Sequence, residues 1–288
     1  METTDAMPPA GGRAPDVGLI IIGDEIMSGK RADKHLPAVI ERLQARGLPL
    51  AYADYVGDSP ERITRTLRRA FASGDIVFSC GGIGATPDDH TRQCAAQALG
   101  VPLELHPQAR LLIEERMRDV ALEQGLPFEP DRTDNRHRLN MGVFPAGAGI
   151  IPNPYNKIPG FSCTTVAGGL AAGGVHFVPG FPVMAWPMVE WVLDTHYAHL
   201  AQRRTWTELS VIVFGAMEAT LTPLMEDIER RFQGVKVFSL PSVDHPQHGR
   251  HIELGVKGEG GEVQSAFDAM KTGLRHFDAR LGPELVRN

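Results

Sequence analysis

The feature that most constrains the fold is an alternation of short apolar runs with amphipathic helices over the first hundred residues. Residues 17–22 consist of glycine and aliphatic side chains, which is typical of a strand buried on both faces of a parallel sheet. Further strands are predicted at residues 50–56 and 75–80. Apolar side chains three and four positions apart predict helices at residues 33–46 and after residue 58. This order indicates a parallel sheet with right-handed helical crossovers.

The rest of the chain divides into two patterns. A strand at residues 175–178 and the helix after it continue the first pattern, whereas the last part reads as strand, helix, strand, strand and helix. We therefore expect a disordered tail at residues 1–16, a large α/β domain at residues 17–200 and a small α+β domain at residues 201–288.

Composition and charge exclude several classes of protein. The 288 residues are 42% hydrophobic and 22% charged, which is the balance of a globular protein. A formal net charge of −6 argues against general affinity for nucleic acid or an anionic membrane. No apolar stretch reaches the roughly 18 residues that a membrane helix needs, and the start of the chain lacks the pattern of a secretory signal. Cys80, Cys94 and Cys163 lack metal or disulfide spacing. We expect a cytoplasmic protein with reduced thiols, whose partner is a small molecule rather than nucleic acid or membrane.

A glycine-rich segment follows the third predicted strand. Residues 81–91 read GGIGATPDDHT, and a helix is predicted to start at Thr86. Glycines between a strand and a helix expose backbone N–H groups beside the positive end of the helix dipole, which suits an anion. The spacing of Thr86 and Asp89 equally fits a helix cap without a ligand, so both interpretations stay open. The dinucleotide fingerprint is excluded because Pro87 stands in place of its last glycine.

Five carboxylates follow the first three predicted strands. They are Asp24 and Glu25 after the first, Asp58 after the second, and Asp88 and Asp89 after the third. Because the carboxyl ends of parallel strands meet at one edge of a sheet, these side chains are expected to converge. A cation would offset their repulsion, and oxygen ligands favour Mg²⁺ or Mn²⁺. Each acid taken alone is also explained by a helix cap or a solvated turn.

Two other clusters are weaker candidates. His245, His248 and His251 are spaced by threes, but Pro246 interrupts any helix that would align them for a metal, so a solvated loop is predicted. The basic cluster at residues 132–138 fits either a clamp for substrate phosphates or a solvated surface.

Several motifs together resemble those of one known family. They are Gly23-Asp-Glu25 with Gly29, Val56-Gly-Asp58, residues 79–91, Asn140, residues 153–161 and Pro179-Gly-Phe-Pro182. With them, residues 17–200 resemble the MoaB/Mog-type molybdenum-cofactor biosynthesis domain, in the branch formed by the N-terminal part of CinA (competence/damage-inducible protein A). The remaining residues resemble the second CinA domain less strongly, and the CinA amidase domain has no counterpart. The resemblance implies a three-layer α/β domain with a mostly parallel sheet that binds a phosphorylated pterin or a nucleotide.

The resemblance also implies roles for individual residues. Asp58 and Asp89 would be the catalytic acids, and Asp24, Asp88 and Asp89 would hold the metal. The positions expected to contact phosphate or another part of the ligand are Gly81, Gly82, Gly84, Thr86, Thr91, Asn140 and Gly180.

Four positions depart from the family pattern. His35 stands where CinA-like chains usually have Asn, Ala85 stands where Pro is usual, and Pro87 interrupts the turn before the acids. Met184 replaces the Glu that is expected after Pro182. The loss of that carboxylate bears on catalysis more than on binding.

These observations lead to one main hypothesis and two alternatives. The main hypothesis is a hydrolase, dependent on Mg²⁺ or another divalent cation, that cleaves a nucleotide pyrophosphate of the ADP-ribose or FAD type. The alternatives are a pterin- or nucleotide-binding protein without turnover and an adenylyltransferase that acts on molybdopterin. Domains of the resembling family assemble as dimers or trimers, so a homo-oligomer is expected.

Overall fold

The computed structural model describes residues 15–201, 206–277 and 279–287. The chain divides into two compact units, Met1–Gln202 and Arg203–Asn288. The predicted tail at residues 1–16 lies outside the described residues as far as residue 14. Asp16, however, belongs to the fold, because its carbonyl oxygen accepts a hydrogen bond of 2.9 Å from the N–H of Ile76.

A six-stranded sheet forms the centre of the described part of the first unit, in the order β2-β1-β3-β8-β7-β6. The strands are β1 (Val17–Ile22), β2 (Leu50–Val56), β3 (Ile76–Cys80), β6 (Gly149–Ile151), β7 (Gly160–Cys163) and β8 (Gly174–Val178). The first four strands in this order pair in parallel, whereas β7 and β6 are antiparallel to their neighbours. The predicted mostly parallel sheet is thereby confirmed.

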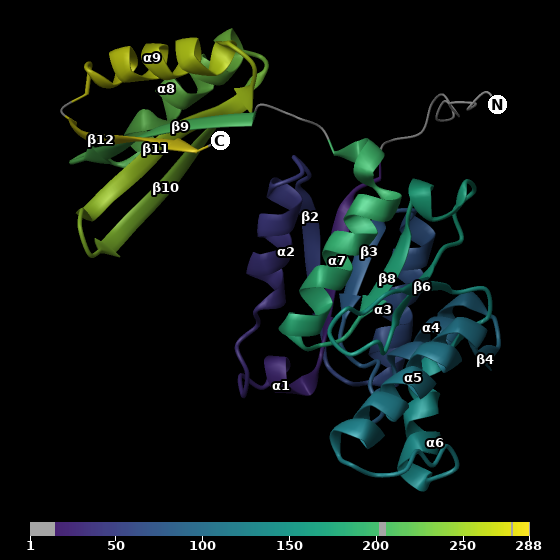
Figure 1. Cartoon of the computed structure of the whole chain (residues 1–288). Helices are drawn as coiled ribbons and strands as arrows, with labels where there is room; N and C mark the ends of the chain where they lie inside the picture. The colour runs from purple at the N-terminus through teal and green to yellow at the C-terminus, as the bar shows by residue number, and fades with distance from the viewer. Residues whose placement is uncertain (1–14, 202–205, 278, 288) are drawn as a thin grey trace. The chain divides into compact units, whose positions relative to one another are not determined.

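Helices cover both faces of this sheet, which confirms the predicted three layers (Figure 1). One face packs against α2 (His35–Gln44) and α7 (Pro182–His196) through a core that includes Leu19, Val39 and Val189. The other packs against α3 (Pro60–Ser73), α4 (Thr91–Leu99) and α5 (Pro107–Glu123), through apolar side chains of all three helices.

The strand order creates a switch point between β1 and β3. The chain leaves β1 through α2 on one face to reach β2, and it returns through α3 on the other face to reach β3. The loops that follow β1 and β3 therefore diverge at the carboxyl edge of the sheet. Open α/β sheets bind ligands in the crevice at such a point.

The start of α4 is the main difference from the prediction. The helix begins at Thr91 and not at Thr86. The N–H of Asp89 donates to the carbonyl oxygen of Thr86 at 3.0 Å, and the Asp89 carboxylate accepts from both the N–H and the hydroxyl of Thr86 at 2.8 and 2.6 Å. These bonds close a turn, so residues 85–90 lengthen the glycine segment instead of starting the helix.

Short elements complete the described part of the first unit. They are α1 (Asp24–Met27), β4 (Leu103–Leu105), α6 (Thr133–Leu139), η1 (Asn140–Gly142), β5 (Val143–Pro145), η2 (Gly169–Ala172) and η3 (Ala198–Leu200). The strands β4 and β5 pair as a small separate sheet. Most of these elements were not predicted, because an element of three or four residues is too short to show an apolar period.

The second unit is an antiparallel sheet covered on one face by two helices. Its elements are β9 (Trp206–Phe214), α8 (Glu218–Arg231), β10 (Val235–His245), β11 (Gly249–Glu259), α9 (Glu262–Leu274) and β12 (Arg280–Arg287). The strand order β10-β11-β9-β12 is that of the ferredoxin-like β-α-β-β-α-β arrangement. The predicted small α+β domain is confirmed. The structure adds a last strand, β12, that the sequence did not predict. Among the described residues of both units, no helix is both long and apolar enough to cross a membrane.

Three stacked phenylalanines form the centre of the first unit's core and generate a stability prediction. The ring of Phe161 lies 4.3 Å from that of Phe177 and 4.6 Å from that of Phe144, and its side chain is fully buried. Phe161→Ala should lower the free energy of unfolding by about 3–5 kcal/mol, because the cavity cannot collapse within a stacked core. Leu111→Ala, at an exposed position, should change it by less than about 0.5 kcal/mol. Urea unfolding followed by circular dichroism measures both, and equal effects would contradict this core.

Candidate functional site

Residues 81–90, called the glycine loop here, join β3 to α4 at the switch point. Gly81 and Gly82 have φ angles of +108° and +67°, which side chains other than glycine rarely adopt. A Cβ atom on Gly81 would lie 2.2 Å from the carbonyl oxygen of Ile22, and one on Gly82 would lie 2.2 Å from the hydroxyl of Thr91. Both positions therefore require glycine, and the loop lies directly against the end of β1.

Thr91 and the end of β8 hold the glycine loop in place. The buried hydroxyl of Thr91 donates to the carbonyl oxygen of Gly81 at 3.1 Å, and its N–H donates to that of Gly82 at 3.0 Å. The N–H of Gly81 donates to the carbonyl oxygen of Val178 at 3.0 Å. The hydrogen bonds from Thr91 thus fix the conformation of the first two residues of the loop. Gly180 lies beside it, since a Cβ on Gly180 would be 3.5 Å from the Cα of Gly81.

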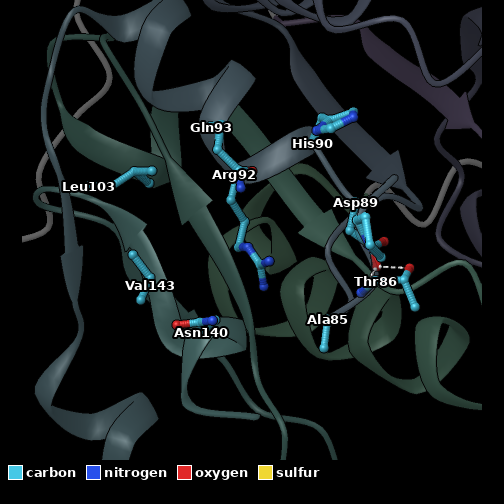
Figure 2. A pocket seen from close by; sticks show the side chains of 10 residues that line it. Ala85, Thr86, Asp89, His90, Arg92, Gln93, Leu103, Asn140 and Val143 are labelled. Atoms are coloured by element: carbon cyan, nitrogen blue, oxygen red, sulfur yellow. Dashed lines mark hydrogen bonds between the residues drawn. The ribbon is translucent and has the colours of Figure 1, made fainter. Parts of the chain in front are cut away.

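A cavity of about 390 Å³ opens beside the glycine loop, and the buried side chain of Arg92 lines it. Figure 2 shows Arg92 extending from α4 into the space between Asn140 and the loop residues Ala85 and Thr86. Its Nη1 donates to the carbonyl oxygen of Ile83 at 2.9 Å. Within the described residues, no carboxylate forms an ion pair with it at 4.0 Å or less.

The charge of Arg92 is therefore poorly compensated. Burial lowers the pKa of the guanidinium, and the more distant Asp89 carboxylate opposes this. The sequence interpretation missed this residue. The residue spacing could have revealed it, because Arg92 precedes the buried residues Ala95 and Ala96 by three and four positions and therefore lies on the same face of the helix. An arginine on an apolar helix face is a detectable signal, because a buried charge is costly without a counter-charge.

Asp24 and Asp58 face each other at the ends of β1 and β2. The N–H of Asp24 donates to Oδ2 of Asp58 at 2.8 Å, and the N–H of Asp58 donates to Oδ1 of Asp24 at 3.0 Å. Burial raises the pKa of Asp58, and the charges of Asp24, Glu25 and Asp88 raise it further, whereas the bond from the Asp24 backbone opposes the shift. The strand ends thus bring four of the five carboxylates within electrostatic reach of one another.

These acids do not form a metal cage. Asp89 is bonded to Thr86 in the turn, and Asp24 and Asp58 are bonded to each other's backbone. Among the residues that the structure describes, no group of three or more His, Cys, Asp or Glu side chains is placed to hold a metal ion. The carboxylates have the right chemistry for Mg²⁺ but not the arrangement, so the divalent cation stays a prediction.

The three histidines of the second unit lie in a hairpin rather than in a solvated loop. The rings of His245, His248 and His251 are 4.9 to 5.6 Å apart at the turn between β10 and β11, and His251 is buried against Phe214. Nδ1 of His245 accepts from the backbone N–H groups of Gln247 and His248 at 3.2 Å. Antiparallel pairing of the strands on either side orders this turn, which the residue spacing alone did not indicate.

The basic cluster at residues 132–138 is paired with its own acids. Arg132 bonds Asp134 at 2.6 and 2.8 Å, Arg138 lies 3.4 Å from the same carboxylate, and Arg136 lies 3.7 Å from Asp131. These exposed pairs favour the interpretation as a solvated surface.

The three cysteines are free and buried. Burial raises the pKa of the Cys163 thiol to about 12 and that of Cys80 still further. None of the three is therefore suited to act as a nucleophile.

The fold and the site define a class of protein: a three-layer α/β domain with a glycine loop and a cavity at the carboxyl edge of its sheet. The chain belongs to the family described as probable molybdopterin binding domain, whose family model matches residues 18–199.

Known relatives agree with this assignment. A CinA-like protein of Anaeromyxobacter dehalogenans strain 2CP-C is 32% identical over 187 residues, which are 65% of this chain and 42% of that protein. A CinA-like protein of Anaeromyxobacter sp. strain Fw109-5 is 30% identical over 87% of this chain and 57% of its own length. The chain thus spans about half the length of these relatives. A crystal structure of CinA from Thermoplasma acidophilum, described as of unknown function, matches with a TM-score of 0.51 at 25% identity, covering 63% of this chain and 96% of that one.

The raised pKa of Asp58 predicts a pH dependence of stability. The folded state binds this proton more tightly than the unfolded state, so the stabilisation is present at low pH and is lost as the pH rises through the folded pKa. Asp58→Asn removes this loss of stability, and the amide oxygen of the variant can still accept the hydrogen bond from the N–H of Asp24. The melting temperature of the variant should therefore rise relative to the unsubstituted chain from about pH 4 to about pH 7.

Asp134→Asn is the matched control for this measurement. Arg132 lowers the pKa of Asp134 to about 2, so any stabilisation by this carboxylate is complete above about pH 4, and the melting temperature of this variant relative to the unsubstituted chain should stay nearly constant from about pH 4 to about pH 7. Thermal unfolding followed by circular dichroism gives both differences. Parallel curves for the Asp58 variant and the unsubstituted chain would contradict the electrostatic crowding.

Proposed function

We propose that the first unit binds a phosphorylated small molecule of the nucleotide or pterin class, with a phosphate at the glycine loop. The observation that carries this proposal is the buried guanidinium of Arg92, which lines the cavity without an ion-pair partner in the described residues. An arginine stays protonated at neutral pH, and a buried charge without a counter-charge is costly. A phosphate in the cavity would supply that counter-charge and accept charge-assisted hydrogen bonds.

Other groups around the cavity suit the same ligand. In the first turn of α4 the N–H of Thr91 is bonded to Gly82, whereas the N–H groups of Arg92 and Gln93 have no acceptor in the described residues, and the positive end of the helix dipole lies at the loop. The amide of Asn140 lines the cavity opposite the loop, and Gln93 lies on its α4 side (Figure 2). Membership of a molybdopterin-binding family supports a ligand that carries a phosphate.

Hydrolysis of a nucleotide pyrophosphate is a second candidate function, and the crowded carboxyl of Asp58 favours it. Its Oδ1 accepts no hydrogen bond within the described residues, so it is free to take a proton from a water that attacks phosphorus. Arg92 and the N–H groups of the α4 start would stabilise the charge on the phosphate oxygens. The described acids form no cage for a metal ion, so this step is assigned to the protein's own groups.

Met184 favours binding without turnover. It occupies the position where the family resemblance implies a Glu, and its sulfur accepts a hydrogen bond of 3.5 Å from the Asn156 amide. A thioether can neither transfer a proton nor hold a hard cation. Adenylyl transfer to molybdopterin stays a third prediction.

The phosphate site is tested by Arg92→Gln. Its affinity for AMP and for inorganic pyrophosphate should fall by between about tenfold and a hundredfold, because charge-assisted hydrogen bonds are lost. Arg132→Gln is the matched control, since that arginine is already paired with Asp134 on the surface. Isothermal titration calorimetry without added metal measures the affinities. Unchanged binding by a folded Arg92 variant would overturn the proposal.

The hydrolase hypothesis needs a separate assay. The protein is incubated with ADP-ribose, FAD or ATP in the presence of Mg²⁺, Co²⁺ or EDTA, and AMP is measured by chromatography. AMP should appear from a dinucleotide with metal, and Asp89→Asn should lower its rate by about a hundredfold while its amide oxygen preserves the turn with Thr86. No AMP above the blank would exclude hydrolysis and leave the binding proposal standing.

The expected homo-oligomer, a dimer or trimer, is part of the same proposal. Light scattering at micromolar concentration gives the mass of the particle, and a monomer would contradict this expectation.

A further inference from the structure

The hairpin of β10 and β11 in the second unit brings three histidines together (Figure 1). His245 ends β10, His248 lies in the turn, and His251 is the third residue of β11. The antiparallel register pairs His245 with Gly249 and Ser242 with His251, which fixes the backbone on both sides of the turn. The centres of the three rings lie 4.9, 5.2 and 5.6 Å apart, and the three side chains are called the histidine cluster below.

The spacing of the rings is that of imidazoles around one metal ion. With Zn–N bonds of about 2.0–2.1 Å and tetrahedral angles, the ring centres of two histidine ligands lie roughly 5 Å apart. All three separations in the cluster are close to this value. Aromatic rings that only pack together have similar separations, so the hydrogen bonds of the three rings are the deciding observation.

His251 has the hydrogen bond that is typical of a metal ligand. Its Nδ1 lies 2.8 Å from the carbonyl oxygen of Gly249. Because a carbonyl oxygen can only accept, Nδ1 carries the proton, and Nε2 of the neutral ring keeps a free lone pair. Histidines that bind metals almost always donate their other N–H in this way, which fixes the tautomer and the orientation of the ring. Phe214 packs against the same ring, with centres 6.2 Å apart.

The free nitrogens of His251 and His248 can be reached from solvent. Neither ring nitrogen of His248 and not Nε2 of His251 has a hydrogen-bond partner in the described part of the chain, and none of these atoms is fully buried. Two rings of the cluster therefore offer lone pairs that no protein group uses.

His245 is the ring that has to move. Its Nδ1 accepts from the N–H groups of Gln247 and His248, both at 3.2 Å, which is long for a hydrogen bond. In this conformation no three side chains of the described residues surround a common ion position. The Cβ–Cγ bond of a histidine points through the ring centre, so a turn about it redirects the nitrogens while the centre stays in place. Such a turn of His245 costs only the two long bonds.

We infer that the histidine cluster binds Zn²⁺ through one nitrogen of each ring, and that the ion replaces the two turn bonds of His245. Three nitrogen ligands leave the fourth tetrahedral position to water. Neutral imidazole suits a borderline cation such as Zn²⁺ and does not suit Mg²⁺, which prefers oxygen. The inference concerns the second unit alone and does not depend on the proposed phosphate site.

Calorimetry with zinc chloride tests the site on the whole chain without an added tag. One ion should bind the cluster with micromolar affinity, and His248→Ala should weaken it by at least about tenfold, because one of three ligands is lost. His245→Asn should weaken it similarly, although its side-chain oxygen can still accept the N–H of Gln247 as in an Asx turn. His276→Ala is the matched control, since that histidine belongs to the same unit and is bonded to Gly273 instead. Its zinc affinity should equal that of the unsubstituted chain.

Nuclear magnetic resonance of the histidine rings gives a second measurement that needs no variant. Zinc should shift the ring nitrogen signals of the three cluster histidines and leave those of His276 in place, whereas Mg²⁺ should shift none of the three.

Three results would overturn the inference. They are the absence of micromolar zinc binding, an equal zinc affinity in His248→Ala, His245→Asn and the control, and ring signals of the cluster that zinc leaves unchanged. The ring signals of the unsubstituted chain keep the test decisive if a variant fails to fold.

Discussion

The close approach of Gly81 to the carbonyl oxygen of Ile22 is the constraint on which the site depends. It brings the carboxyl ends of β1 and β3 together, and it leaves room there for no side chain. Thr91 then fixes the loop by bonding Gly81 and Gly82, which sets where α4 begins. Because α4 begins there, Arg92 is buried at the cavity and not exposed on the helix surface.

The edge of the sheet carries opposite charges on its two sides. Arg92 brings a buried positive charge to one side of the glycine loop, and the carboxylates around Asp58 bring a negative group to the other. This combination suits phosphate-transfer enzymes, in which a guanidinium and N–H groups bind the anion while a carboxylate accepts or donates a proton. Under the proposal, binding without turnover is favoured by two features: the Asp24 carboxylate is bonded to the backbone of Asp58, and Met184 stands where the family resemblance implies a Glu.

The second unit has its own core and its own charge network. Arg287 of β12 bonds Glu208 at 2.6 Å and Glu253 at 2.5 Å, which joins three neighbouring strands on the face opposite the helices. This arginine lowers the pKa of Glu253. The apolar strands and the two helices bury one another within the unit, which gives it a hydrophobic core of its own.

The sequence by itself determined the strands of the parallel sheet and the small second domain, because apolar periodicity is a local property that burial then satisfies, and the family resemblance of its motifs implied the three layers. It also placed the glycines and acids at strand ends, whose convergence follows from parallel pairing alone. Tertiary structure alone decided that Thr86 and Asp89 close a turn, that Arg92 faces a cavity and that one nitrogen of His35 lacks a partner. The physical reason is that hydrogen-bond partners and burial at the site come from segments far apart in the chain, such as Gly180 beside His35, and no local pattern records them.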